Sequence, residues 1–422
     1  MFRVIVNAWK VKEIREKILY TLLILLIYKI GCFVPVPGVD VAYIAEQVKN
    51  FDFLGFLNLF SGGSLSQMTI FALGVSPYIN SSIIMNLLTI AIPALERLAK
   101  EEDGKEKIAD ITRYVTIGLA VIQAIGVLVM IGEDAFIASS TGFGKFMNYF
   151  TVVACLTAGT SLVVWFGDKI NEKGIGNGVS LIIFIGIVSS LPTTVISMFK
   201  SVFEGTTAWW ILVIVIVVMA AVIVGITMVE KAERRVPVQY AKRVVGRRQM
   251  GGQSSYIPMK VNQSGVMPII FAVTFIQFPL MIAQFWPDSA FYAWYTKYMG
   301  GGSALYAIIY ALLIFGFTYF YAQIAFNPVD ISKNIQQYGG FVPGIRPGKP
   351  TSDYLTRILS RITFFGAVFL ALIAAIPTLF SIAGLSNAFS STSLMIAISV
   401  ALETMTTLES QMMMRHYKGF LK

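Results

Sequence analysis

The sequence predicts an all-α membrane protein, first because of its composition and its long uncharged runs. Of its 422 residues, 56% are hydrophobic and only 13% are charged, whereas a soluble domain carries roughly 25% charged residues. Residues 208–229 contain no ionisable group at all. A bilayer core about 30 Å thick needs about 20 such residues as a helix, because lipid offers the backbone no hydrogen-bond partner.

Hydropathy predicts ten transmembrane helices. They cover approximately residues 18–36, 74–93, 114–132, 149–166, 177–192, 208–229, 266–285, 304–326, 362–381 and 392–412. The second and fifth are short and rich in Gly, Asn and Ser. Such helices suit positions that face protein or a water-filled cavity rather than lipid.

The distribution of lysine and arginine supports this topology. With an even number of spans, both termini lie on one side, and that side holds 28 of the 33 Lys and Arg residues. The opposite side holds 4, and Lys29 lies within the first span. Cytoplasmic loops of membrane proteins carry such an excess of positive charge. We therefore expect a multi-pass protein of an inner (plasma) membrane with both termini in the cytoplasm.

One segment between the first two spans, residues 51–67, is apolar but too short to cross. A run of this length indicates a surface helix or a re-entrant segment. From the residues alone, a helix packed on the outer face is the simpler interpretation.

Two long cytoplasmic loops have defined sequence character. Loop 230–265 alternates apolar and polar residues before Gly246, which predicts a β-hairpin that projects from the membrane. Loop 327–361 contains GGFVPGIRPGKP, whose prolines and glycines indicate a stiff loop with sharp turns. The positive charge of these loops is explained by membrane topology alone. Arginines on stiff, projecting loops, however, favour docking to an anionic surface.

The sequence offers little for catalysis or for cofactor binding. It contains one histidine, His416, and two cysteines far apart, Cys32 and Cys155. Neither an HExxH nor a Gly-x-Ser-x-Gly motif is present, and Gly348-Lys349 fails the phosphate-loop pattern. We therefore expect no enzyme activity, no metal and no cofactor.

Aliphatic and weakly polar stripes follow the two short spans. Ile79 and Ile83 share one helix face, as do Val179 and Ile183, while Ser82, Asn86 and Thr89 form a polar stripe. Ordinary helix packing accounts for such stripes. The functional alternative is a narrow aliphatic constriction that resists water and ions by dewetting.

Several motifs resemble one known family along essentially the whole chain. They are GVSPYINSSIIMNLL (74–88), GIGNGVSLIIF (174–184), the loop and helix start at 236–272, GGFVPGIRPGKP (339–350) and the tail at 409–422. All five, in this order, are similar to the SecY/Sec61-alpha family of protein-conducting channels.

The resemblance implies an architecture that periodicity does not give. The ten helices would form two pseudo-symmetric halves, residues 1–192 with spans 1–5 and residues 193–422 with spans 6–10. The halves would form a clamshell around a central hourglass pore. Segment 51–67 would become the plug of the outer funnel rather than a surface helix, through Phe53, Leu54, Phe56, Leu57, Leu59 and Phe60.

The resemblance also implies the residues of the pore and its gate. The pore ring would consist of Ile79, Ile83, Val179, Ile183, Ile270 and Ala401. Val179 stands where isoleucine is common in the family, and Ile398 and Leu402 are neighbouring candidates for the tenth-span position. Ser82, Asn86, Thr274 and Gln277 would line a lateral gate toward lipid.

Partners follow from the same resemblance. Arg247, Arg248 and Arg346 would dock the SecA motor ATPase or the ribosome. SecE and SecG would complete a heterotrimer, and the substrate would be an unfolded preprotein with a signal sequence. The chain would pass it across the inner membrane or release its apolar spans into membrane lipid.

Two other classes of protein stay open on the residues alone. A secondary transporter with broken helices would need ionisable or ion-coordinating groups at the membrane midplane. A membrane-embedded enzyme would need a nucleophile and a base within the helix bundle, and the single histidine lies outside it.

Overall fold

The computed structural model describes residues 8–50, 54, 58, 61–101, 103–132, 135–136, 143–205, 208–240, 243–245, 248–250, 254–263, 265, 267–283, 286, 289–299, 303–382 and 391–419. Its helices are α2 (Lys12–Gly31), α3 (Val41–Asn50), α5 (Ser76–Ala91), α6 (Pro93–Lys100), α7 (Gly104–Ile131), α8 (Phe143–Lys173), α9 (Gly178–Phe203), α10 (Trp209–Lys231), α11 (Met267–Ala283), α12 (Ala290–Met299), α13 (Ala304–Ala325), α14 (Pro328–Gln337), α15 (Lys349–Ile382) and α16 (Ser391–Gly419). Its strands are β1 (Glu233–Tyr240), β2 (Arg243–Val245), β3 (Arg248–Met250), β4 (Ser254–Lys260) and β5 (Gly340–Phe341).

Every predicted span overlaps a helix. These helices are α2, α5, α7, α8, α9, α10, α11, α13, α15 and α16. Within the described part of the chain, six helices are long and apolar enough to cross a membrane, or seven if α5 and α6 form one bent span. The protein is therefore mostly helical with several apolar spans, and ten crossings remain a prediction.

The bend between α5 and α6 has a local cause. Pro93 begins α6 and has no backbone N–H, so the α5 ladder cannot continue through it. The preceding residue, Ile92, takes an extended conformation, with φ −107° and ψ 113°, as steric contact with a following proline demands. The two helices consequently meet at 104°.

The chain forms two compact units. Unit 1 comprises residues 1–207, 276–300 and 400–422, and unit 2 comprises residues 208–275 and 301–399. Two of the unit boundaries therefore fall inside α11 and α16, at Ile276 and Val400. The predicted halves, residues 1–192 and 193–422, are defined by span order rather than by contacts, and they remain a prediction.

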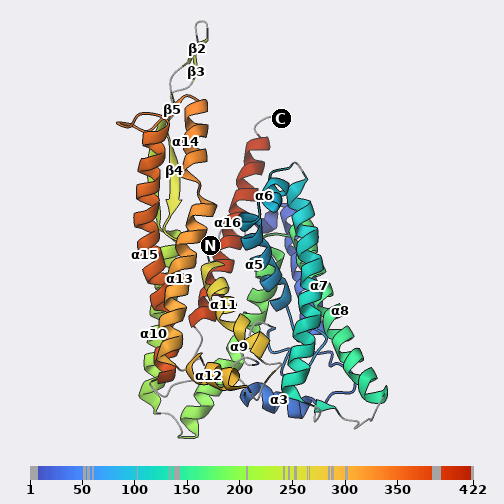
Figure 1. The fold of residues 1–422 in the computed structure, drawn as a ribbon. Coiled ribbons are helices and arrows are strands. Elements are labelled where there is room, and N and C mark those ends of the chain that lie inside the picture. The colour runs from blue at the N-terminus through green and yellow to red at the C-terminus, as the bar shows by residue number, and fades with distance from the viewer. Residues whose placement is uncertain are drawn as a thin grey trace. The chain divides into compact units, whose positions relative to one another are not determined.

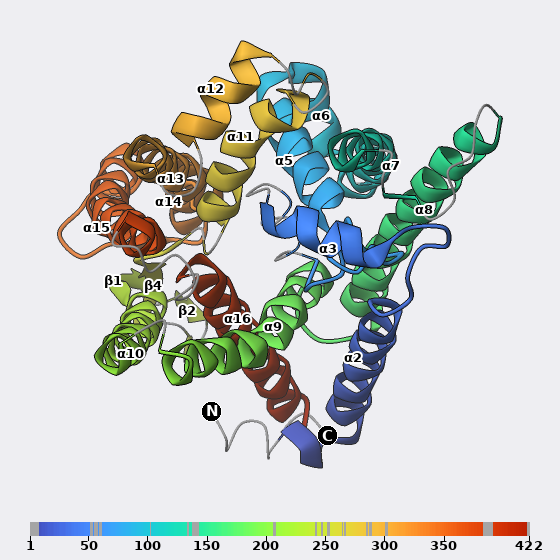
Figure 2. The same cartoon turned by 90° about the horizontal axis from the view of Figure 1, so that it is seen from below.

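Unit 1 has an apolar core between α3, α7, α8 and the turns that precede α5. Its fully buried members include Ile44, Leu54, Met68, Leu128 and Leu156. In Figure 2, α5 and α7 lie side by side, and residue contacts join α7 to α8 and α8 to α9. A glycine permits one close approach in this unit, because a methyl group added at Gly159 would lie 1.9 Å from the carbonyl oxygen of Ile70.

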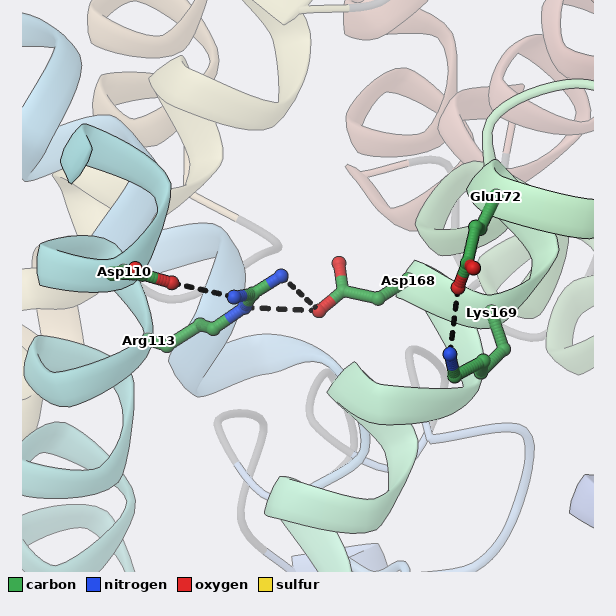
Figure 3. A network of polar contacts seen from close by, with 5 residues as sticks. All are labelled: Asp110, Arg113, Asp168, Lys169 and Glu172. Atoms are coloured by element: carbon green, nitrogen blue, oxygen red, sulfur yellow. Dashed lines mark hydrogen bonds and ion pairs between the residues drawn. The ribbon is translucent and has the colours of Figure 1, made fainter. Parts of the chain in front are cut away.

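Polar contacts fix α5, α7 and α8 at the side that the charge count assigns to the cytoplasm. Ser81 on α5 donates to the carbonyl oxygen of Thr112 on α7 at 2.7 Å. Arg113 on α7 forms ion pairs with Asp168 on α8 at 2.8 Å and with Asp110 at 2.6 Å. Figure 3 shows Arg113 between the two carboxylates, with Lys169 and Glu172 as a separate pair.

Unit 2 combines helices with a small sheet. Helix α13 packs along α15, and Figure 1 shows them side by side over their length. The predicted hairpin is present: β1 pairs with β4, and β2 pairs with β3, both antiparallel. Strands β2 and β3 lie beyond the end of α15 (Figure 1), so the hairpin projects from the helices of its own unit.

Candidate pore wall and docking surface

The motif at 174–178 sets the start of α9. Asn177 caps this helix, since its Oδ1 accepts hydrogen bonds from the backbone N–H groups of Val179 at 3.1 Å and Ser180 at 3.4 Å. The N–H of Gly178 donates to Oδ1 of Asn171 on α8 at 2.7 Å. Three donors that would otherwise be unpaired at the helix start thus find side-chain acceptors, and the chain reverses sharply between α8 and α9.

Glycines allow α8 and α9 to approach each other closely. A methyl group added at Gly178 would lie 2.1 Å from the carbonyl oxygen of Gly167 on α8. Gly176 has φ +81°, a conformation that side-chain-bearing residues rarely adopt. Gly176 and Gly178 therefore allow backbone conformations and contacts that a side chain would prevent. They fix the position of the residues that follow, beginning with Val179.

The same turn contacts α2 and the last helix. The N–H of Ile175 donates to Oγ1 of Thr21 on α2 at 3.1 Å. A methyl group at Gly176 would lie 3.3 Å from Oγ1 of Thr404 on α16. Ile175 is buried with Ile14 and Leu408 in one apolar cluster. The start of α9 is thus held by three other helices of unit 1.

The predicted ring residues differ in burial. Ile83, Ile183 and Ile270 are buried, whereas Ile79 and Val179 are half-buried and Ala401 is exposed. Five of them belong to unit 1 and Ile270 belongs to unit 2. No interaction between ring residues of different helices is resolved among the described residues, so the ring itself remains a proposal.

The predicted gate residues lie on α5 and α11. Ser82 is half-buried and Asn86 is exposed, four residues apart on one face of α5. Thr274 and Gln277 are half-buried and three residues apart on α11. Each pair shares a helix face, which agrees with the stripes expected from the sequence.

Most of the predicted plug lies outside the described residues, namely Phe53, Phe56, Leu57, Leu59 and Phe60. Leu54 is described, and it is fully buried in the apolar core of unit 1. Asn58 is described as well. Its backbone carbonyl accepts from the N–H of Gly63 at 2.8 Å, and its Oδ1 accepts from the N–H of Ser66 at 2.9 Å.

The two predicted docking loops share one sheet. Strand β5, from the second loop, pairs antiparallel with β1, from the first, through Gln239–Phe341 and Tyr240–Gly340. The strand order is β4-β1-β5. Beneath the sheet, apolar residues from both loops and from α15 form one cluster that includes Val236, Val238, Met259, Val342 and Leu355. We refer to this sheet and the loop at 342–348 as the docking platform.

The loop that carries Arg346 is held at several points. The hydroxyl of Ser332 on α14 donates to the carbonyl of Gly348 at 2.7 Å, and Thr351 Oγ1 donates to the carbonyl of Arg346 at 2.8 Å. Gly344 and Gly348 have φ values of +80° and +95°, which glycine adopts without strain. The Arg346 backbone is therefore fixed, while its side chain is exposed.

Of the other two predicted docking arginines, only one is described. Arg248 begins β3, and Arg247 lies outside the described residues. On β1, Arg235 stacks over the ring of Tyr256 at 4.8 Å and pairs with Glu233 at 2.7 Å. The hydrogen bond to Glu233 raises the pKa of the Arg235 guanidinium, so this arginine is engaged within the sheet and keeps its charge.

The sequence did not reveal a polar cluster at the base of the hairpin. Oε1 of Glu230, at the end of α10, accepts hydrogen bonds from Nδ2 of Asn262 and from the hydroxyl of Ser399, both at 2.8 Å. Asn262 is 3% exposed and also donates to the carbonyl of Gly265 at 3.0 Å. One carboxylate thus joins α10, the segment before α11, and α16 within unit 2. The sequence contains Glu230 directly after an uncharged run and Asn262 in the loop, but nothing in it indicates that the two pair.

Comparison with known proteins identifies the chain. A family model described as SecY matches residues 69–405. The chain is 42% identical to the protein translocase subunit SecY of Streptomyces coelicolor over 439 residues, covering 100% of both chains. It is also 42% identical to the protein of that name from Halalkalibacterium halodurans, again over 100% of both.

Solved structures agree in fold. A structure described as a protein-conducting channel superposes with a TM-score of 0.66 at 17% identity, covering 94% of this chain and 92% of the other. Sec61 in a canine ribosome–channel complex gives a TM-score of 0.62 at 16% identity, with the same coverage. The fold is therefore that of protein-conducting membrane channels.

The chain belongs to the SecY family. It is the protein-conducting channel subunit of a Sec translocase, a multi-pass protein of the bacterial plasma membrane. Family membership makes it a channel and not an enzyme.

Proposed function

We propose that the chain passes unfolded, signal-bearing polypeptides through a pore whose narrowest point is a ring of aliphatic side chains. The ring consists of Ile79, Ile83, Val179, Ile183, Ile270 and Ala401. Since its substrates share no side-chain pattern, an apolar ring that makes no specific hydrogen bonds suits all of them. The same ring limits ion leak, because water leaves a narrow apolar constriction.

The register between α9 and α16 carries this proposal. Gly176 and Thr404 are neighbours, because a methyl carbon added at Gly176 would lie 3.3 Å from Oγ1 of Thr404. In the proposed topology α9 leaves the cytoplasmic side and α16 returns to it. Ala401 precedes Thr404 by three residues within α16, so it lies about 4.5 Å further from the cytoplasm. Val179 follows Gly176 by three residues and is the second residue of α9, so it also lies further from the cytoplasm. Two ring members on different helices thus share one level.

Closure and lateral release complete the proposed cycle. Segment 51–67 closes the outer funnel, and the burial of Leu54 supports an apolar seat for it. Ser82, Asn86, Thr274 and Gln277 line a gate through which a sufficiently apolar segment moves into lipid, driven by its own transfer free energy. Both termini, and therefore the docking platform, lie in the cytoplasm.

Partner docking uses Arg346 on the docking platform and Arg247 and Arg248 of the hairpin loop. The Arg346 side chain is exposed and its backbone is already held in place. This supports the role, because the loop need not be ordered when a partner binds. Sec61 from dog and Ssh1 from yeast are described in complexes with ribosomes. SecA is the other expected cytoplasmic partner, and SecE and SecG the expected membrane partners in a heterotrimer.

Site-specific crosslinking tests the ring. A cysteine at Ile183 is expected to crosslink to a precursor arrested during translocation, whereas one at Val217, an exposed position on α10, is not. Crosslinks from Val217 but not from Ile183 would exclude the proposed pore wall. Co-purification of SecE and SecG with the chain tests the heterotrimer.

A further inference from the structure

Lys29 is a charged residue inside the first apolar span, and nothing in the proposed pore accounts for it. It lies near the end of α2, three residues before Cys32. A lysine within a span is unfavourable unless it reaches polar partners or the interface, and such residues mark functional sites more often than not.

The amino group of Lys29 bridges two other segments. Its Nζ donates to Oγ of Ser189 on α9 at 2.8 Å and to the carbonyl oxygen of Gly62 at 3.3 Å. The Ser189 hydroxyl in turn donates to the carbonyl of Gly186 at 2.8 Å, so the lone pairs of its oxygen are free to accept from the lysine. The chain therefore has a charge-assisted link between α2, α9 and the C-terminal part of segment 51–67.

Gly62 and Gly63 form a tight turn within segment 51–67, which we call the plug hinge. Gly62 and Gly63 have φ values of +65° and +89°, which only glycine adopts readily. A methyl group added at Gly62 would lie 2.7 Å from Cα of Gly186, so this hinge rests directly on the α9 backbone. Gly186 and Ser189, one turn apart on α9, form the seat on which it rests.

Hydrogen bonds connect the hinge to Asn58, which precedes it in segment 51–67. The N–H of Gly63 donates to the carbonyl of Asn58 at 2.8 Å, as does the hydroxyl of Ser61 at 3.1 Å. Asn58 follows the fully buried Leu54 by four residues. These contacts tie Asn58 to the turn at Gly62 and Gly63, so the Lys29 contact restrains the described C-terminal part of segment 51–67.

We propose that Lys29 is a positioning residue that latches the plug hinge to α9 and thereby sets how readily the closed pore opens. The inference rests on the proposed closing role of segment 51–67. It adds to that role a specific restraint, made by a side chain that belongs to neither the proposed ring nor the proposed gate.

The test measures resting ion conductance of sealed vesicles that contain the full chain with its partner subunits. Lys29→Met keeps the length of the side chain and removes the charged donor. We expect it to raise resting conductance about tenfold, the factor that a hydrogen bond to a charged group contributes to an equilibrium. Lys29→Arg should stay near wild type, because it restores the donor.

Two further variants separate a latch from a general structural role. Lys200→Met removes a charge from an exposed lysine that pairs only with Glu204 among the described residues, at 3.6 Å, and should leave conductance unchanged. Ser189→Ala keeps the lysine and removes its nearer acceptor, so it should raise conductance by a smaller factor than Lys29→Met. Equal conductance of Lys29→Met, Ser189→Ala and wild type would overturn the latch.

Deletion of residues 53–60 distinguishes the latch from the proposed function beneath it. If the deletion raises resting conductance but Lys29→Met does not, the plug stands and the latch is wrong. If the deletion leaves conductance unchanged, the closing role of the segment is refuted and the latch falls with it. The expected result is a rise in both.

Discussion

Replacing Gly178 by alanine tests how the start of α9 is built. The added methyl carbon would lie 2.1 Å from the carbonyl oxygen of Gly167 and 2.8 Å from its carbonyl carbon. Because both neighbours belong to backbone, neither can rotate aside, and α8 and α9 must separate by about 1 Å in a close-packed interior. Overpacking of this kind destabilises a protein by about 1–3 kcal/mol.

The expected stability change is measured as the thermal midpoint of the complex in detergent. A domain of this size loses about 2–4 °C per kcal/mol, so the midpoint should fall by several degrees. Gly118→Ala on α7 is the matched control, because a methyl group there meets nothing within 4 Å. Alanine should stabilise that helix by up to about 1 kcal/mol.

The functional consequence follows from position. Val179 is the next residue after Gly178, so a shift of the first turn moves a proposed ring member, and resting ion conductance should rise. A Gly178→Ala chain as stable and as tightly sealed as Gly118→Ala would refute the packing at Gly167. It would also mean that the contact between Gly178 and Gly167 does not fix the position of Val179.

Three other substitutions test separate parts of the protein. Glu230→Leu removes the acceptor of two 2.8 Å hydrogen bonds and should destabilise the complex by about 2–3 kcal/mol; Glu230→Gln, which keeps an acceptor oxygen, should recover most of this, and equal losses would disprove the network. Arg346→Glu should weaken SecA or ribosome binding about tenfold with unchanged stability. Lys333→Glu, at an exposed position in the same loop, is the control. Equal effects of the two variants would mean that binding depends only on the overall charge of the loop. Ile183→Asn should raise resting conductance or relax signal-sequence selection, whereas Ile183→Leu should do neither, and wild-type behaviour of the Asn variant would exclude Ile183 from the ring.

The helices were predictable because long apolar runs leave few alternatives. Residues 208–229, for example, predict α10, which the structure forms from Trp209 to Lys231. The hairpin followed from alternation and from Gly246, and β1 and β4 pair as expected. The turn at 174–178 was recognised only as a family motif, since its contacts with Gly167 and Thr404 depend on partners distant in sequence.

Long-range pairing explains most of what sequence reasoning missed. Strand β5 has two residues and pairs with β1 from another loop, and no local pattern reveals such a partner. Helix α14 could have been predicted, because Asn327 and Pro328 form a cap and first position of the usual kind. Lys29 was noticed as an unusual charge within a span, but its acceptors Ser189 and Gly62 emerge only from the fold.

Transport itself is the most direct test of the account. The chain would be reconstituted with SecE, SecA and ATP in sealed vesicles, and protection of a signal-bearing precursor from added protease would be measured. The account predicts protection that requires this chain, ATP and the signal sequence together. Absence of protection, with the complex demonstrably assembled, would contradict the channel function and favour a transporter instead.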